Sequence, residues 1–276
     1  MISELINSEF SKCKELLHKQ GQLEARAVIE GVNPGRVFVD NPERPATGVV
    51  WLHNNDGFIF FGDETNECFN KELNDFIESV IKPEAKKVGL DWFEAIGNHQ
   101  GWNKTFENVF SNHSLGSWNQ RVYMLHKEEF TYKNIAPIEE GYLIVKIDSD
   151  LLRNKTRVIS NLSFLETEIM EFWSSSERFF DNGIGYCVIQ NNKIVSMCYS
   201  GFVAGNVHCL GIETLKEHQG KRLGQNVATA LIHDCLQSGI IPYWDCMETN
   251  KASSAIAEKL GFKNVFNYTG YDFSLK

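Results

Sequence analysis

Residues 218–232 have the sequence HQGKRLGQNVATALI, in which a polar, basic turn runs directly into an apolar-periodic stretch. Gly220 and Gly224 leave the backbone of this turn bare, and Lys221 and Arg222 place two adjacent cations in it. The first N–H groups of a helix have no partner within the helix, and the helix dipole adds partial positive charge there. We therefore expect the turn to be able to hold a pyrophosphate at the start of the helix that follows.

The turn also has an ordinary alternative, which is a solvated helix start with two surface cations. It contains neither the GxxxxGK[ST] pattern of a nucleotide-binding P-loop nor the GxGxxG pattern of a dinucleotide-binding fold. The helix itself carries an apolar stripe, which predicts that it is attached to a core. This stripe consists of Leu223, Val227, Ala230, Leu231 and Cys235.

The segments around the turn favour the ligand-binding interpretation. An apolar strand pattern, CLGIET, precedes it at 209–214, and a short buried strand pattern, IIPYWDC, follows the helix at 240–246. Pro242 is unusual in a central strand, because proline removes a donor from the ladder. It is accommodated if this strand parts from its neighbour and leaves that N–H group unneeded. A gap between two parallel strands would then be a slot for an extended ligand that bonds to backbone groups.

In this order the segments resemble the Gcn5-related N-acetyltransferase (GNAT) superfamily. The loop from Gln219 to Gly224 resembles its Q/R-x-x-G-x-G/A signature, and Asn250 followed by AEKLGF at 257–262 resembles its closing helix. The longer string GIET…QGKRLG…PYWDC…N…S…AEKLGF is similar to the branch that includes the zwittermicin A resistance acetyltransferase. The superfamily resemblance covers roughly residues 160–276, and the branch resemblance extends over the whole chain.

The resemblance implies the acyl-CoA N-acyltransferase fold, a mixed α/β (α+β) architecture whose twisted central sheet is splayed between two parallel strands. It implies acetyl-CoA as the cofactor, with the pyrophosphate on the loop and the pantetheine arm in the splay. It also implies direct transfer of the acetyl group to an amine within a ternary complex. The residues that it assigns to CoA binding are Ile212, Thr214, Gln219, Gly220, Lys221, Arg222, Leu223, Gly224, Gln225, Asn250 and Ser253.

Three positions depart from the superfamily pattern. Arg222 replaces the first loop glycine, and an arginine costs about 1 kcal/mol or more if that position needs a positive φ. Ala257 stands where many members carry a tyrosine that protonates the leaving thiolate, and Cys209 stands where some members carry a glutamate base. The departures at Ala257 and Cys209 leave the proton-transfer residues open, whereas the one at Arg222 lies in the cofactor loop.

The chemistry needs a deprotonated amine, a polarised carbonyl and a proton for the thiolate. Glu213 is the candidate base, with a strand-end carboxylate facing water as the alternative. His208, on the same strand, has a pKa suited to proton transfer but is more often a structural histidine. Tyr268 and Tyr271 are the candidate acids, and both equally suit a core or rim position. Asp245 and Glu248, at the end of the splayed strand, are candidates to hold a cationic amine, although Asp245 equally suits a cap.

Composition narrows the partners further. A net charge of −9 argues against nucleic-acid binding and is compatible with a small cationic substrate. No segment approaches the roughly 18 consecutive apolar residues of a membrane helix, and the first 20 residues predict an amphipathic helix rather than a signal peptide. Seven cysteines without a CxxC pair predict reduced thiols in the cytoplasm. The histidines show no metal-ligand spacing, so no metal is assigned.

The 276 residues predict two α/β halves with the same order of elements, divided into 1–135 and 140–276. The first half contains patterns predicted as a strand at 25–32 and a hairpin turn at HNNDG, residues 53–57. The acidic segment GDETNE at 62–67 stands where a repeat would place the phosphate loop, so we expect no CoA there. This half could border the acceptor pocket or form a dimer surface. The oligomeric state, monomer or homodimer, therefore stays open.

The sequence thus predicts an acetyl-CoA-dependent N-acetyltransferase that acts on a primary amine of a small molecule. Two alternatives belong to other classes. The departures at the acid and base positions favour a non-catalytic acyl-CoA sensor, and an open acceptor side would favour a protein N-acetyltransferase.

Overall fold

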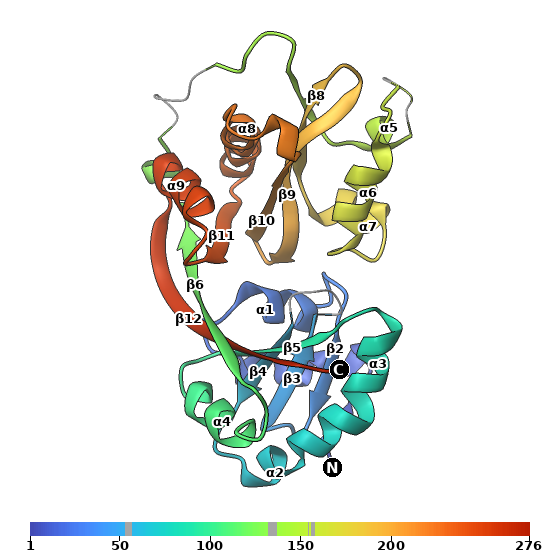
Figure 1. Cartoon of the computed structure of the whole chain (residues 1–276), viewed down its shortest axis with the longest axis vertical. Coiled ribbons are helices and arrows are strands. Elements are labelled where there is room, and N and C mark those ends of the chain that lie inside the picture. Colours follow the sequence, from blue (N-terminus) through green and yellow to red (C-terminus); the bar gives the residue numbers. More distant parts are fainter. Residues whose placement is uncertain (53–56, 132–136, 154, 156–157) are drawn as a thin grey trace. The chain divides into compact units, whose positions relative to one another are not determined.

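The computed structural model describes residues 1–52, 57–131, 137–153, 155 and 158–276, and it divides into two compact units (Figure 1). Unit 1 comprises Met1–Arg121, Met247–Thr249 and Phe266–Lys276, and unit 2 comprises Val122–Cys246 and Asn250–Val265. The predicted turn residues 53–56 and the predicted end of the first half at residue 135 lie outside the described residues. The units are not consecutive halves of the chain, because unit 1 includes the C-terminal strand.

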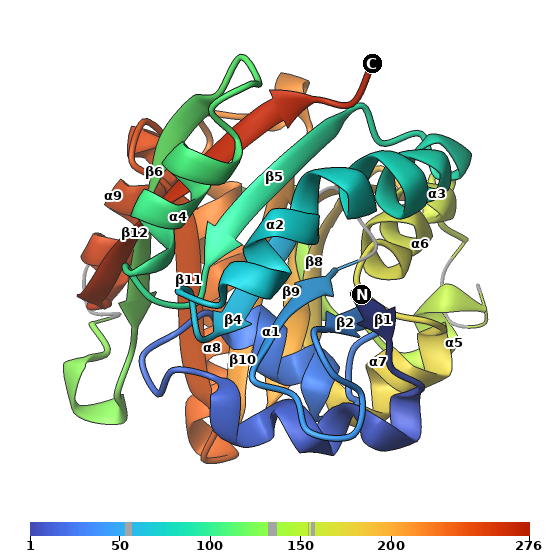
Figure 2. The ribbon, with the colours of Figure 1, turned by 90° about the horizontal axis from the view of Figure 1, so that it is seen from below.

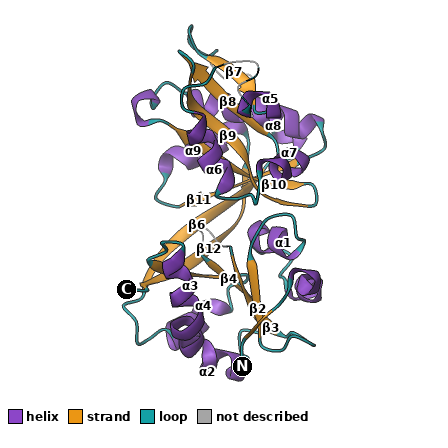
Figure 3. Cartoon of the chain, turned by 90° about the vertical axis from the view of Figure 1, so that its right-hand side faces the viewer, coloured by secondary structure: helices purple, strands orange, loops and turns teal. Residues whose placement is uncertain are grey.

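Unit 1 is built on a mixed sheet with the strand order β1-β2-β3-β4-β5-β12. The pair β4·β5 is parallel and the other neighbours are antiparallel, and Figure 2 shows the C-terminal strand beside β5. Helices cover both faces of these strands (Figure 3). The elements are β1 (Ser3–Glu4), the 3-10 helix η1 (Asn7–Leu16), α1 (Leu23–Ile29), β2 (Arg36–Val39), β3 (Thr47–Trp51), β4 (Phe58–Gly62), α2 (Glu67–Phe76), the π-helical segment η2 (Ile77–Ile81), α3 (Lys82–Lys87), β5 (Trp92–Gly97) and α4 (Trp102–Val109).

Two predictions for unit 1 are wrong. The predicted strand at 25–32 is helix α1, because its alanines and its Glu and Arg favour a helix, and a short buried apolar run does not distinguish the two by periodicity. The predicted N-terminal amphipathic helix is a two-residue strand followed by the 3-10 helix η1. Its buried side chains, Phe10 and Cys13, are three residues apart, which matches three residues per turn.

Unit 2 is built on strands in the order β6-β11-β10-β9-β8-β7, of which β6 belongs to it from Val122 onward. Helices α8 and α9 lie on one face of these strands, and α6 and α7 lie on the other (Figure 1). The segment 162–182 forms two helices, and the second begins at the cap Ser175, whose side chain accepts from Arg178 N–H. The elements are β7 (Leu143–Lys146), α5 (Ser149–Leu152), α6 (Leu162–Met170), α7 (Ser176–Asn182), β8 (Gly185–Gln190), β9 (Lys193–Ala204), β10 (Val207–Thr214), the 3-10 helix η4 (Lys216–His218), α8 (Leu223–Gln237), β11 (Ile241–Met247) and α9 (Lys251–Leu260), with the short helix η3 (Lys127–Glu129) after β6.

The two series of six strands repeat one another in order and direction. Strands β1 to β4 and strands β7 to β10 are antiparallel series, and each series continues through a helix into a parallel strand, β5 or β11. A further helix, α4 or α9, then leads to a closing strand. This correspondence bears out the predicted repeat.

The closing strands are exchanged between the sheets. Strand β6 (Gly116–Met124) follows α4 in the chain but lies beside β11, whereas β12 (Lys263–Ser274) follows α9 but lies beside β5. In β12, the residues Gly270–Ser274 pair antiparallel with Trp92–Ile96 of β5. Each half of the sequence therefore supplies the last strand of the other half's sheet.

The structure also shows the state of the cysteines and the lengths of the apolar helices. None of the seven cysteines, all of which lie in described parts of the chain, forms a disulfide. No helix in the described ranges combines the length and apolarity needed to cross a membrane.

Candidate active site

The parallel strands β10 and β11 part along their length. They pair only at Val207–Cys209 with Ile241–Tyr243. Beyond the last pair, β10 continues to Thr214 and β11 to Met247. The predicted splay is therefore present in unit 2.

Pro242 lies in the paired part and does not cause the gap. Ile241 N–H donates to the Asn206 carbonyl at 2.8 Å, and the Pro242 carbonyl accepts from Leu125 N–H at 3.0 Å. Because main-chain groups of successive residues point to opposite sides of a strand, the missing N–H of Pro242 faces β6, not β10. The prediction of a splay was correct, but the explanation through proline was wrong.

Every second residue of β10 directs its main-chain N–H and C=O groups toward the gap. The Glu213 carbonyl accepts from Ser196 Oγ at 3.1 Å, and Leu215 N–H donates to the Val195 carbonyl at 2.9 Å, so these odd-numbered positions face β9. By alternation, the main-chain groups of Ile212 and Thr214 face the side from which β11 has parted. Both residues were predicted to bind CoA.

The loop before α8 has the backbone that the glycine signature requires. Arg222 is the N-cap of α8 with φ 62° and ψ 15°, in the left-handed region, and Gly220 has φ 78°. A Cβ added at Gly224 would lie 3.2 Å from Ile212 Cδ1 and 3.4 Å from Thr214 Oγ1, so the helix start approaches β10 closely. The strain expected for an arginine at this position is therefore present.

The side chains of the loop have different environments. Gln219 Nε2 donates to the Thr214 carbonyl at 3.2 Å, which ties the loop to β10. Lys221 Nζ donates to Tyr142 Oη at 2.9 Å and lies over that ring, so its side chain is engaged within unit 2. Leu223 is buried in the core.

A buried donor lies in the first turn of α8. The Gln225 side chain is 6% exposed, and its Oε1 accepts from Lys259 Nζ at 3.1 Å. Its Nε2 has no hydrogen-bond partner among the described residues. Buried polar atoms are nearly always paired, so this donor fits a site that takes an acceptor-rich ligand such as the CoA pyrophosphate and pantetheine amides.

Asn250 and Ser253 act as structural groups in α9. The Asn250 side chain caps the helix by accepting from Ser253 N–H at 3.1 Å, and Ser253 Oγ accepts from Trp244 Nε1 at 2.9 Å. Contacts of both residues with CoA stay predictions. Ala257, at the position of the superfamily tyrosine, is fully buried in the core of unit 2.

The candidate catalytic residues lie in unlike places. His208 is 4% exposed, its Nδ1 lies 2.8 Å from Ser200 Oγ, and burial lowers its pKa to about 4. At pH 7 its imidazole is therefore uncharged, and the contact with Ser200 fixes its position, as expected for a structural histidine. Glu213 is exposed on the strand that faces the gap. Tyr268 belongs to unit 1, where it lines a cavity of about 560 Å³ that His18 and other residues of unit 1 also line.

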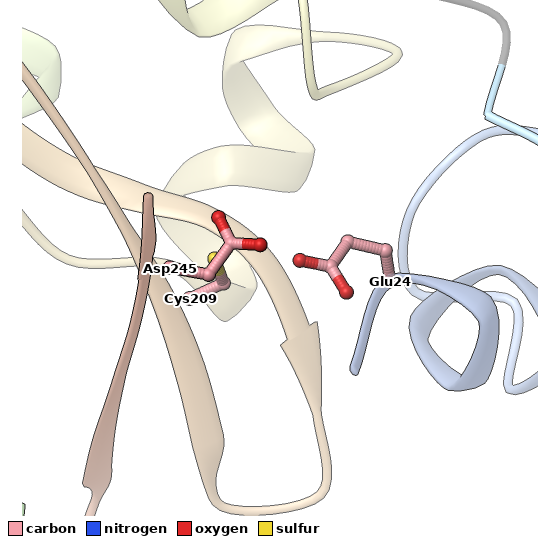
Figure 4. A group of neighbouring side chains, drawn as sticks. All are labelled: Glu24, Cys209 and Asp245. Carbon is pink, nitrogen blue, oxygen red and sulfur yellow. The ribbon is translucent and has the colours of Figure 1, made fainter. Parts of the chain in front are cut away.

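The two predicted substrate carboxylates have different surroundings. Figure 4 shows Asp245 and Cys209 on neighbouring strands, and a carboxylate oxygen of Asp245 lies within 4.8 Å of Cys209 Sγ. Glu248 belongs to unit 1 and pairs with Arg121, with Glu248 Oε1 2.7 Å from Arg121 Nη2.

A pair of residues that sequence reasoning missed lies on the α6 face of the sheet. Tyr199 Oη, on β9, donates to Glu168 Oε2, on α6, at 3.2 Å. Burial raises the pKa of Glu168, and the nearby carboxylates of Glu171 and Glu213 raise it further. The sequence shows each residue on its own element, but no local pattern shows that they meet.

The described part of unit 1 differs from this site at both places, since β5 stays paired with β4 up to its last residue and the helix that follows β4 has a side-chain cap. Its parallel strands pair from Phe58–Phe60 to Ala95–Gly97, and the Asn98 N–H then donates to the Phe60 carbonyl at 2.8 Å. Helix α2, at the corresponding place in the repeat, is capped by Asn66, whose side chain accepts from Phe69 N–H at 3.1 Å.

Known proteins share both the sequence pattern and the fold. A sequence model of the family described as GNAT acetyltransferase matches residues 14–271. An uncharacterized N-acetyltransferase of Bacillus subtilis strain 168 is 27% identical over 272 residues, which cover 98% of each chain.

Solved structures show the same fold. A GCN5-related N-acetyltransferase-like protein from Streptococcus suis has a TM-score of 0.70 at 19% identity and covers 96% of this chain and 98% of its own. A tandem GNAT protein from the clavulanic acid biosynthesis pathway has a TM-score of 0.64 at 10% identity, with 100% of this chain and 98% of its own covered. Its description as a tandem protein agrees with the two repeated sheets seen here. Together with the family match over most of the chain, the splayed strands and the glycine loop, this shows that the chain is an N-acetyltransferase of the GNAT acetyltransferase family.

Proposed function

We propose that this enzyme uses acetyl-CoA and binds it in unit 2. The observation that carries the proposal is the parting of β10 from β11 beside the bare helix start at 220–224. The N–H groups of this loop and the Arg222 side chain would hold the pyrophosphate. The main-chain groups of Ile212 and Thr214 would hold the pantetheine arm, and Gln225 Nε2 offers a further donor. The cofactor supplies the acetyl group as an activated thioester.

The acceptor in this proposal is a primary amine of a small molecule. Burial and the nearby carboxylates of Glu171 and Glu213 raise the pKa of Glu168 on the α6 face of unit 2, and Asp245 adds another carboxylate to this unit. Such a surface suits a cationic substrate, as does the net charge of −9. The resemblance to the zwittermicin A resistance branch supports an aminated antibiotic or metabolite as the substrate.

One observation favours a non-catalytic acyl-CoA sensor as the second candidate. The position of the superfamily tyrosine is the fully buried Ala257, and the position of its glutamate is Cys209. Thiol release from acetyl-CoA, measured with spermidine, glucosamine, an aminoglycoside and a lysine peptide, separates the candidates. Release with the small amines supports the proposal, binding without release supports the sensor, and release only with the peptide supports a protein acetyltransferase.

Cofactor binding is tested at the loop itself. We expect Arg222→Glu and Gly224→Pro to abolish acetyl-CoA binding measured by calorimetry, because the first places an anion at the phosphate site and the second removes an N–H donor from the first turn of α8. Lys216→Glu, which makes the same charge change at an exposed residue of η4, is the matched control and should bind like the wild type. Unchanged affinity in both loop variants would refute this site.

A further inference from the structure

We propose that Glu168 is the base that accepts the proton of the acceptor nitrogen, and that Tyr199 positions it. This inference rests on the proposed function, since it requires the acetyl donor to lie along β10. It replaces His208 and Glu213, the bases expected from the sequence.

The position of Tyr199 connects this pair to the gap between β10 and β11. Tyr199 lies directly opposite Gly211 in the β9·β10 ladder. A Cβ added at Gly211 would lie 2.9 Å from Tyr199 Cζ and 3.2 Å from its Oη, so the phenol covers the bare main chain of Gly211. The next residue, Ile212, is the one whose main-chain groups face the gap.

Both residues lie on the face of the sheet that α6 covers. The side chains of Leu210 and Ile212 pack with the core that contains α8, so the intervening Gly211 and the following Glu213 face the opposite side. Helix α6 packs against β9 on that side, and it carries Glu168. An amine that approaches the thioester from the α6 face would meet the Glu168 carboxylate beside Gly211.

The surroundings of Glu168 suit a base. Burial raises its pKa first, Glu171 on the same helix and Glu213 on β10 raise it further, and the hydrogen bond from Tyr199 on β9 opposes them. A carboxylate with a raised pKa is a stronger proton acceptor at neutral pH. Burial and the Glu168 carboxylate in turn raise the pKa of Tyr199, so its hydroxyl stays protonated and donates.

The proton balance of the reaction is complete with this assignment. An ammonium acceptor loses two protons on becoming an amide, and the first leaves to solvent and exposes the nitrogen lone pair. The lone pair forms the C–N bond while the C–S bond breaks, and Glu168 accepts the second nitrogen proton. The sulfur keeps the C–S electron pair and takes a proton from solvent, and Glu168 then returns its proton to solvent.

The test compares pH profiles of kcat/KM for the best amine of the panel. We expect Glu168→Gln to lower kcat about 10²–10⁴-fold and to remove the rise of the rate with pH that belongs to this carboxylate. The titration of the amine is common to all variants, so the ratio of variant to wild-type rates isolates Glu168. Glu166→Gln, an exposed carboxylate on the same helix, is the matched control and should keep the wild-type rate and profile.

Tyr199→Phe separates positioning from structure. Because the Tyr199 hydrogen bond lowers the pKa of Glu168, its loss should move the rise of kcat/KM to higher pH and lower kcat, with the affinity for acetyl-CoA by calorimetry unchanged. A merely structural role would leave the profile in place. Wild-type turnover with an unaltered profile in Glu168→Gln would overturn the inference alone, whereas a wild type that releases no thiol with any amine would overturn the proposed function and the inference with it.

Discussion

His208 shows how burial decides the role of a single side chain. The sequence places it on the cofactor strand with a pKa suited to catalysis, yet the structure holds it neutral against Ser200. Desolvation disfavours the charged imidazolium, and no carboxylate contributes to the shift of its pKa. The histidine therefore links folding to pH instead of serving as a base.

His208 predicts a loss of stability in acid. Its folded pKa of about 4 lies below the usual value of 6.5, so the unfolded chain binds the proton more tightly. The stabilisation is complete above pH 6.5 and is lost as the pH falls toward 4, by up to about 3 kcal/mol. Urea unfolding of the wild type and His208→Gln at pH 7.5 and 4.5 measures this difference. An equal loss in both proteins would contradict it.

Residues whose role is local could be predicted from the sequence, and residues brought together by register could not. The loop from Gly220 to Gly224 is formed by neighbouring residues. Its sequence signature therefore indicated both the uncovered N–H groups at the helix start and the position, Arg222, whose backbone is left-handed. Tyr199 depends on a register shift between His208 and Leu210. Without that shift Ser200, not Tyr199, would stand opposite Gly211, and no pattern in either strand indicates it.

Among the elements, the start of α8 balances stability against binding. Arg222→Gly should stabilise the fold by about 1 kcal/mol, because glycine adopts the observed φ of 62° without the penalty of a side chain. The same variant should bind acetyl-CoA about tenfold more weakly, because it loses a charge-assisted donor. Thermal unfolding and calorimetry on the same samples measure both effects.

Gly220→Ala is the converse control for this helix start. Its φ is 78° and no atom lies within 4 Å of an added Cβ, so the change introduces backbone strain without a clash. We expect it to destabilise the fold by about 1 kcal/mol. If Arg222→Gly fails to stabilise while Gly220→Ala destabilises as expected, the left-handed conformation of Arg222 is not a cost to the fold.

For the whole molecule, periodicity predicted the order of most elements but not how the sheets are completed. The hairpin across Asn191 and Asn192 follows from a local pattern, because both residues adopt the positive φ that such a turn needs. The exchange of β6 and β12 joins residues far apart in the sequence, and strand patterns do not specify partners. The consecutive division into 1–135 and 140–276 followed from reading the chain in order.

The exchanged strand β12 supplies part of the core of unit 1. Phe273, on β12, stacks against Phe93 of β5 with ring centroids 5.1 Å apart and is 2% exposed in the core of unit 1. Phe273→Ala should therefore cost about 3–5 kcal/mol although it lies three residues from the C-terminus. Lys276→Ala, which removes only an exposed ion pair with Asp91, should cost less than about 0.5 kcal/mol.

The exchange of strands predicts that the first half of the chain does not fold by itself. A fragment of residues 1–121 lacks β12, so the edge of β5 loses its paired strand and the ring of Phe93 loses its contact with Phe273. We expect this fragment to show no cooperative unfolding transition in urea, and we expect a peptide of residues 263–276 added in trans to restore part of it. The peptide with Phe273→Ala should restore less, because the edge pairing alone does not replace the lost ring contacts. Cooperative unfolding of the fragment alone, at the midpoint of the full chain, would show that unit 1 is complete without the exchanged strand.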